Sequence, residues 1–180
     1  SLDVVNQEKV ISYNNNKVQI KDLLAPLLSS SDESALDIIV KQYGYSNFVK
    51  KMNSKAAAIK LNNTTIVEPS GLSEKTLSTV YDIAKLIKYT NDFKPFLLTI
   101  SSSTSSTSTL NIYAGRSGYY GGSFGFLPTQ YHSLAGIFDI SVNTNLVDVI
   151  NGNTQNNITE ESRKKKVVIV ISGSINPEGD

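Results

Sequence analysis

The feature that most constrains the fold of this chain is a change in hydrophobic period about halfway along it. Before residue 90, apolar residues recur at helical spacing in four stretches. From residue 110 onward, apolar and glycine residues form short runs that are typical of strands. Helices that precede strands, without alternation, predict an α+β fold with an antiparallel sheet.

The first part of the chain begins with an expected hairpin around an asparagine-rich turn, followed by the helices. The helices are expected at about 22–28, 32–43, 46–61 and 76–90. Short polar side chains cap helix N-termini, so we expect Asp22, Ser31 or Asp32, and Ser46 to begin the first three, and Gly44 to end the second. The expected buried face of the fourth helix consists of Val80, Ile83, Ala84 and Ile87.

Four strand candidates follow a serine- and threonine-rich stretch, residues 101–109, which we expect to be a loop. They are residues 110–115, 122–128, 132–142 and 164–174. The last two contain the longest apolar runs, which predicts burial on both of their faces.

Composition excludes several kinds of function. The net charge is +1, so neither nucleic acid nor an anionic membrane is an expected partner. The chain has no cysteine and a single histidine, His132, which excludes thiolate metal sites and argues against a Ser-His-Asp triad. We therefore expect no metal and no cofactor. No apolar run reaches the length of a membrane span.

Four stretches of the helical part resemble one enzyme family, the D-alanyl-D-alanine carboxypeptidases, which are low-molecular-mass penicillin-binding proteins related to the serine β-lactamases. The stretches are KVQIKDLLAPLL, SDESALDIIVKQYG, FVKKMNSKAAAIKLNNTTIVEPSGL and LSTVYDIAKLI. The residues at matching places are Asp22, Phe48, Met52, Asn53, Lys55, Ala56, Pro69, Gly71, Leu72, Ser78, Thr79 and Asp82.

The resemblance implies a single but partial transpeptidase domain over residues 1–180, with a helical part at 17–90, a sheet part at 110–176 and no N-terminal segment. It also implies serine-type hydrolysis of peptidoglycan stem peptides without a cofactor. The protein would then act outside the cytoplasmic membrane of a bacterium, secreted or membrane-associated. In the family, N-terminal strands pair beside the closing hairpin, so we expect a missing segment or a partner chain at that sheet edge.

The first of the family's three motifs, S-x-x-K, supplies the acylated serine and the lysine that accepts its proton. In the family this motif lies upstream of the segment that begins at Lys17, so we expect the nucleophile before Ser1 or in another chain. The textual match from Ser162 to Lys165 is interpreted as a solvated run of charge.

The second motif, S-x-N, aligns on Ser31, Asp32 and Glu33. Asparagine donates an N–H to the substrate carbonyl, whereas an ionised glutamate cannot donate and repels a carboxylate. A slip of one residue, onto Ser30 to Asp32, meets the same objection. We interpret Ser31 as the remnant of a catalytic position, Glu33 as a substrate-binding position, and the segment as a helix cap.

The third motif, K-[ST]-G, fits two registers. In the favoured one, Ser123, Phe124 and Gly125 occupy the three places. The cation that would bind the terminal carboxylate of a peptide is then lost, and an aromatic ring occupies the groove.

The other register places Arg116, Ser117 and Gly118 in the motif. This register keeps a cation and a hydroxyl, but it needs an insertion before the next strand.

Three functions follow from these alternatives. The first is a catalytically degenerate domain that binds a peptidoglycan peptide or another protein. The second is an active carboxypeptidase whose nucleophile lies in a missing segment or another chain. The third is a binding protein of another class with an aromatic contact surface, formed by Tyr113, Tyr119, Tyr120, Phe124, Phe126 and Tyr131.

Overall fold

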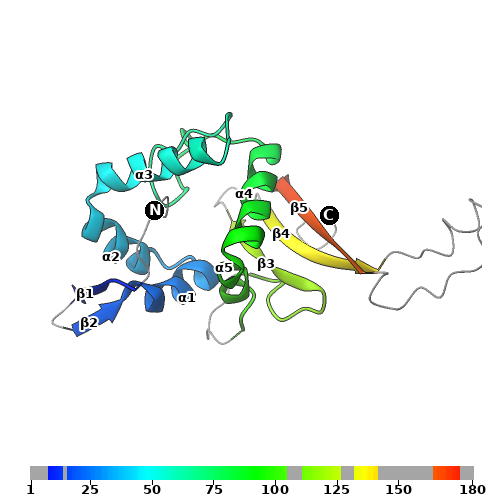
Figure 1. Cartoon of the computed structure of the whole chain (residues 1–180), viewed down its shortest axis with the longest axis horizontal. Coiled ribbons are helices and arrows are strands. Elements are labelled where there is room, and N and C mark those ends of the chain that lie inside the picture. The colour runs from blue at the N-terminus through cyan, green and yellow to red at the C-terminus, as the bar shows by residue number, and fades with distance from the viewer. Residues whose placement is uncertain (1–7, 14–15, 105–110, 127–131, 142–163, 175–180) are drawn as a thin grey trace, which may run out of the picture.

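The structure is a computed structural model that describes residues 8–13, 16–104, 111–126, 132–141 and 164–174 (Figure 1). The elements before the sheet are β1 (Val10–Tyr13), β2 (Asn16–Gln19), α1 (Ile20–Ser30), α2 (Glu33–Tyr43), α3 (Tyr45–Ala58), α4 (Val80–Phe93) and α5 (Pro95–Ser101). The sheet consists of β3 (Tyr119–Phe126), β4 (His132–Ser141) and β5 (Lys164–Ser174). Helices precede an antiparallel sheet of order β3-β4-β5, so the predicted α+β architecture is confirmed.

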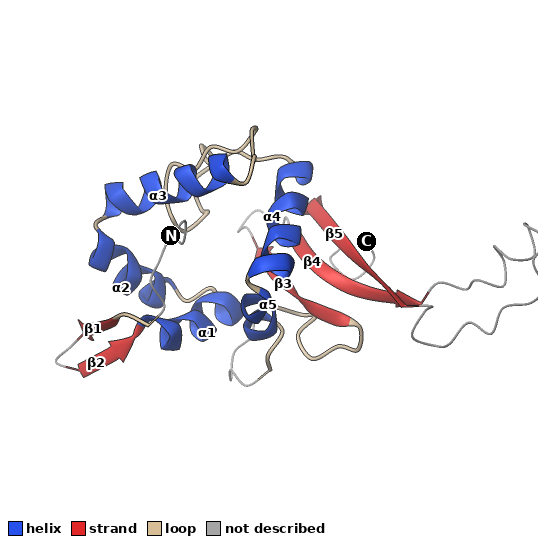
Figure 2. Cartoon of the chain, in the orientation of Figure 1, coloured by secondary structure: helices blue, strands red, loops and turns tan. Residues whose placement is uncertain are grey.

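Helices α1, α2 and α3 form an arm beside the sheet, and α4 and α5 pack against the sheet itself (Figure 2). The three helices enclose a small hydrophobic core. Ile20, Ile39 and Phe48 contribute to it from the three successive helices, and Ile11 contributes from β1. Ile20 is 0% exposed and Ile39 is 2% exposed. Burying side chains of this size stabilises the fold by about 2 kcal/mol each, so this small core holds the arm together.

The junction between α1 and α2 forms as the sequence predicts. Ser31 ends α1 in the left-handed conformation, with φ 52°. Asp32 caps α2, because its carboxylate accepts the backbone N–H groups of Ser34 at 2.8 Å and Ala35 at 3.1 Å. Gly44 ends α2 with φ 77°, as expected.

Three predicted helix starts are wrong. Helix α4, expected from residue 76, begins at Val80, because the side chain of Thr79 caps it there. Strand β2 leads directly into α1 at Ile20, so Asp22 lies in the first turn of the helix instead of capping it. Its negative charge is still favourable there. Helix α3 starts at Tyr45, before Ser46, because the carbonyl of Gly44 already accepts the N–H of Phe48 at 2.9 Å.

Other differences arise where tertiary contacts override local pattern. Residues 111–118 form turns instead of the expected strand, and α5 is an additional helix that begins with Pro95 at its N-terminus.

Val80 is 53% exposed, since it lies on the outer side of α4. The expected burial on both faces is wrong for the last two strands, because Ile140 is 41% exposed and Val168 is 37% exposed. The expected loop at 101–109 lies outside the described residues from 105 onward.

Glycine allows α5 to lie directly on β3. Gly121 has φ 140°, and a Cβ there would lie 2.1 Å from the carbonyl oxygen of Leu98 in α5. The next residue, Gly122, donates its backbone N–H to the hydroxyl of Ser101 at 2.9 Å. This contact fixes the position of β3, which forms one wall of the site described next.

Candidate functional site

A groove with a volume of about 590 Å³ lies between the α1–α2 junction, the loop at 69–72 and strand β3. The junction contributes Ser31 and Glu33, and β3 contributes Ser123, Phe124 and Gly125. The structure therefore brings together the residues aligned with the second motif and those aligned with the favoured register of the third. These two groups are about 90 positions apart in the chain.

The residues of the other register lie elsewhere. None of Arg116, Ser117 and Gly118 lines this groove. The Nε of Arg116 donates to the carbonyl of Ile112 at 3.1 Å, and its guanidinium lies 5.7 Å from the ring centre of Tyr113. These contacts hold the arginine within its own turn.

Only part of the S-x-x-K match from Ser162 to Lys165 lies within the described residues. Ser162 lies outside them, whereas Lys165 is an exposed residue near the start of β5. The side chain of His132 also lies outside the described part.

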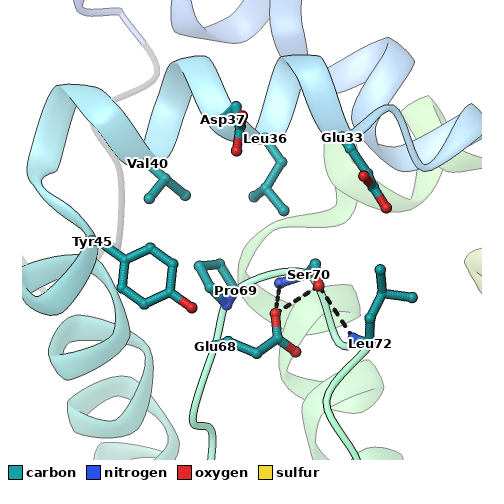
Figure 3. A pocket seen from close by; sticks show the side chains of 9 residues that line it. All are labelled: Glu33, Leu36, Asp37, Val40, Tyr45, Glu68, Pro69, Ser70 and Leu72. Atoms are coloured by element: carbon teal, nitrogen blue, oxygen red, sulfur yellow. Dashed lines mark hydrogen bonds between the residues drawn. The ribbon is translucent and has the colours of Figure 1, made fainter.

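A second pocket, of about 250 Å³, lies between α2 and the loop at 68–72 (Figure 3). Its walls share Glu33, Leu36, Pro69, Ser70 and Leu72 with the groove, so the two spaces adjoin. The residues that line the pocket alone are Asp37, Val40, Tyr45 and Glu68.

The loop at 68–72 is organised by Glu68, which sequence reasoning missed. Its carboxylate accepts the N–H of Ser70 at 2.5 Å, the hydroxyl of Ser70 at 2.6 Å and the N–H of Ser73 at 3.1 Å. Burial raises the pKa of Glu68, but hydrogen bonds from Ser70, Ser73 and Gly71 outweigh that effect and lower the pKa below its usual value. The available sequence signal was an acidic residue directly before a Pro-Ser-Gly turn.

Both spaces are acidic. The groove is lined by Asp32 and Glu33, and the pocket by Glu33, Asp37 and Glu68. No lysine, arginine or histidine is among the described residues that line either space. Such a surface repels an anionic group of a ligand and attracts a cationic group.

Some rings of the expected aromatic surface are buried in the protein, and others are exposed to solvent. Tyr119 is 8% exposed, and its ring lies 5.9 Å from that of Tyr113 and 5.0 Å from that of Phe138. Tyr120 is 42% exposed and lies beneath the ammonium of Lys166, at 3.7 Å from its ring centre. Tyr131 and the side chain of Phe126 lie outside the described residues.

The residues with a described position contain no group of three or more histidine, cysteine, aspartate or glutamate residues arranged to hold a metal ion. None of their helices is long and apolar enough to cross a membrane.

Solved structures with the same fold are penicillin-binding proteins and D-alanyl-D-alanine carboxypeptidases. A putative penicillin-binding protein homologue from Mycobacterium tuberculosis superposes with a TM-score of 0.68 at 16% identity, covering 93% of this chain and 67% of that one. A peptidoglycan synthesis regulatory factor from Streptococcus pneumoniae gives 0.66 at 18% identity, covering 98% of this chain and 50% of that one. These similarities establish the penicillin-binding-protein type of transpeptidase fold.

Sequence comparison then identifies the family. The sequence profile of D-alanyl-D-alanine carboxypeptidase matches residues 3–117, and the chain belongs to that family. It is 41% identical to the D-alanyl-D-alanine endopeptidase of Escherichia coli over 75 residues, which are 41% of this chain and 24% of the relative. The D-alanyl-D-alanine endopeptidase of Pseudomonas aeruginosa is 38% identical over 74 residues, 40% of this chain and 24% of the relative. The matched region spans about a quarter of the length of these curated relatives.

Proposed function

We propose that this chain is a catalytically degenerate, peptide-binding domain of the penicillin-binding-protein type, acting on the cell wall as a binding or scaffold module. Its ligand would be a peptidoglycan stem peptide, bound in the groove without hydrolysis. The main support for this proposal is that Glu33, Ser123 and Phe124 line the same groove. In the favoured alignment, Glu33 takes the place of the family's asparagine amide, Ser123 that of its lysine and Phe124 that of its hydroxyl residue.

The chemistry of the replaced groups supports binding without turnover. The carboxylate of Glu33 accepts hydrogen bonds but donates none when ionised, so it cannot orient a substrate carbonyl as an asparagine amide does. Ser123 carries no charge to attract the terminal carboxylate of a peptide. Phe124, which is half-buried in the groove wall, instead offers apolar contact area.

The experiment is performed on the full-length protein that contains this chain. We expect a pentapeptide ending in D-Ala-D-Ala to bind, as measured by calorimetry, without release of D-alanine and without covalent labelling by a fluorescent penicillin. Labelling of a serine, with D-alanine release, would overturn the proposal in favour of an active carboxypeptidase. Loss of that release in Arg116→Ala would then assign the third motif to the Arg116 register.

The proposal extends to the site of action and to a sheet partner. A cell-wall ligand implies that the protein acts outside the cytoplasmic membrane. Strand β5 pairs with β4 on one side, and no strand among the described residues pairs with its other side. An open edge of 11 residues favours a further segment of the full-length protein, or a partner chain, as a neighbour. Slow amide exchange throughout β5 in the full-length protein is the expected result, and fast exchange at alternate amides would contradict it.

A further inference from the structure

We propose that the outer surface formed by the start of α4 and by the paired segments 65–67 and 75–77 docks on an anionic lipid bilayer. We call this surface the docking face. Its apolar members are Val67, Leu77, Val80 and Tyr81, and its cations are Lys60, Lys75 and Lys85. None of these residues lines the groove or the pocket, so the proposal is independent of the proposed peptide binding.

The apolar side chains of the docking face are exposed to water. Val67 is 40% exposed and Leu77 is 62% exposed. Val80 and Tyr81, which follow in the first turn of α4, are 53% and 69% exposed. A single exposed apolar residue is ordinary on a protein surface, whereas a contiguous group of them is typical of an interaction surface.

The backbone places Val67, Leu77 and Lys75 on one side of the loop. Thr65 and Leu77 form an antiparallel bridge with two backbone hydrogen bonds of 2.8 and 2.9 Å. In extended segments, residues two positions apart project to the same side. Val67 and Lys75 are each two positions from the bridge, and the intervening residues are less exposed than they are. The docking face is therefore contiguous from this loop to α4.

Tyr81 and Lys60 are held beside each other by Lys85. The ammonium of Lys85 lies 4.4 Å from the ring centre of Tyr81, and it donates to the backbone carbonyl of Lys60 at 2.9 Å. The same ammonium lies 3.6 Å from the carboxylate of Asp82, which is 0% exposed. The surface is thus ordered before any partner binds. A tyrosine, with an apolar ring and a polar hydroxyl, suits the interface between lipid head groups and acyl chains.

The charges of the helical part are distributed unevenly. Residues 20–44, which form α1 and α2, contain two lysines and four acidic residues. Residues 45–93, from α3 to the end of α4, contain seven lysines and four acidic residues. The net charge of +1 thus conceals a cationic side at α3 and the start of α4, which lie together at the top of Figure 1, away from α1.

The acidic residues of this second segment leave the lysines of the docking face largely unopposed. Asp82 is buried, Glu68 lines the pocket, and Asp92 pairs with Lys88 near the other end of α4. Glu74 is the remaining acidic residue between 45 and 93, a segment that the structure describes throughout. Such a surface attracts an anionic partner.

A lipid bilayer fits both properties of the docking face. Lysines near a membrane surface attract anionic head groups, and apolar side chains beside them enter the interface. A second copy of the chain, related by a two-fold axis, would place the same lysines against each other, which is repulsive. A soluble polyanion would pair with the lysines but would leave Leu77 and Val80 in water.

The test uses the full-length protein and sedimentation with two kinds of vesicle, one of phosphatidylcholine alone and one of phosphatidylcholine and phosphatidylglycerol in equal amounts. We expect about tenfold stronger binding to the anionic vesicles, decreasing as salt is added. The double variant Leu77→Ser, Tyr81→Ser removes apolar contacts, and the double variant Lys60→Gln, Lys75→Gln removes two cations. Each should weaken binding to the anionic vesicles by about tenfold.

Two single variants serve as matched controls. Phe93→Ser removes an aromatic side chain that is 66% exposed at the other end of α4. Lys17→Gln removes an exposed cation from β2. Both controls should bind the anionic vesicles as the unaltered protein does. Melting temperatures verify that every variant is folded.

The proposal is overturned if the unaltered protein does not bind the anionic vesicles or binds both kinds equally. Full binding by either folded double variant also overturns it. If the variant that keeps full binding is Leu77→Ser, Tyr81→Ser, and inorganic polyphosphate displaces the protein from the vesicles, the partner is a soluble polyanion instead of a bilayer. Peptide binding is measured separately, so these outcomes leave the proposed function intact.

Discussion

The side-chain amide of Asn53 in α3 forms two hydrogen bonds with the backbone of Ile66. Its nitrogen donates to the carbonyl of Ile66 at 2.7 Å, and its oxygen accepts the N–H of Ile66 at 3.0 Å. The same nitrogen also donates to the carbonyl of Val49 at 3.0 Å. Asn53 thus takes the place of a neighbouring strand for Ile66, two residues before the loop that lines the groove and the pocket.

Replacing Asn53 with alanine should destabilise the protein by about 2 kcal/mol, because each lost hydrogen bond is worth roughly 1 kcal/mol and Ile66 keeps partial access to water. The measurement is urea denaturation, combined with amide exchange at Ile66, which should become faster. Asn47→Ala is the control, since Asn47 is exposed on the same helix and should change stability by less than about 0.5 kcal/mol. Equal effects of the two substitutions would contradict the role assigned to Asn53.

The free energy of unfolding should decrease in acid, partly because of Asp82, which is 0% exposed. Burial raises the pKa of its carboxyl, but the N–H of Asn63 at 2.8 Å, the hydroxyl of Thr64 at 3.0 Å and the charge of Lys85 outweigh burial and lower the pKa. A carboxyl whose pKa is lower in the folded state stabilises the fold above the unfolded value of 3.8. That contribution is lost as the pH falls through the lower, folded pKa.

Asp82→Asn should therefore be less stable than the unaltered protein at pH 7 and should lose less stability between pH 5 and pH 2. Urea denaturation over this pH range provides the measurement. A residual slope is expected, since hydrogen bonds also lower the pKa of Glu68 and Asp92. An unchanged pH profile in the variant would show that Asp82 titrates equally in the folded and unfolded states.

Gly121→Ala should destabilise the protein far more than Gly71→Ala, although both glycines have a positive φ. At Gly121 the added Cβ would lie 2.1 Å from the carbonyl oxygen of Leu98, so α5 would have to move away from β3. At Gly71 no heavy atom lies within 4 Å of the added Cβ, which leaves only the cost of the left-handed backbone, about 1 kcal/mol. We expect a loss of about 3 kcal/mol or more for Gly121→Ala in denaturation experiments. Equal losses would mean that α5 and β3 adjust freely.

The features that sequence reasoning predicted are those that neighbouring residues determine. Asp32 caps α2 by accepting the backbone N–H groups of Ser34 and Ala35, two and three residues ahead, and Gly44 ends α2 by adopting a positive φ. The missed features depend on distant partners. Residues 111–115 of the expected strand form turns instead, and the side-chain amide of Asn111, which is 3% exposed, donates to the hydroxyl of Tyr119 at 2.7 Å. No local pattern shows such a contact.

The candidate site also contains residues that were predicted from the sequence and residues that were missed. Glu33, Ser123 and Phe124 were found because a family resemblance supplied long-range information that periodicity lacks, and the structure places all three in one groove. The adjoining pocket was missed because no motif connects Asp37 with Glu68, which are 31 positions apart and approach only through the fold.

The charge of Glu33 should control how the groove treats a peptide's anionic end. In Glu33→Gln, an amide that can donate replaces a carboxylate that repels, so a pentapeptide with a free terminal carboxylate should bind about three- to tenfold more tightly. The gain should shrink as salt is raised from 0.02 to 0.5 M, because the screening length falls from about 20 Å to about 4 Å. Calorimetry on the full-length protein provides the measurement.

Two controls separate this charge effect from a general change in the groove. The same pentapeptide with an amidated C-terminus should show a smaller gain, since it has no terminal charge for Glu33 to repel. Arg116→Ala should leave the affinity unchanged, because Arg116 donates to Ile112 and does not line the groove. If Arg116→Ala instead weakened binding of the free-acid peptide while Glu33→Gln had no effect, the cation that receives the peptide's carboxylate would be Arg116, and the assignment of the third motif to Ser123, Phe124 and Gly125 would be wrong.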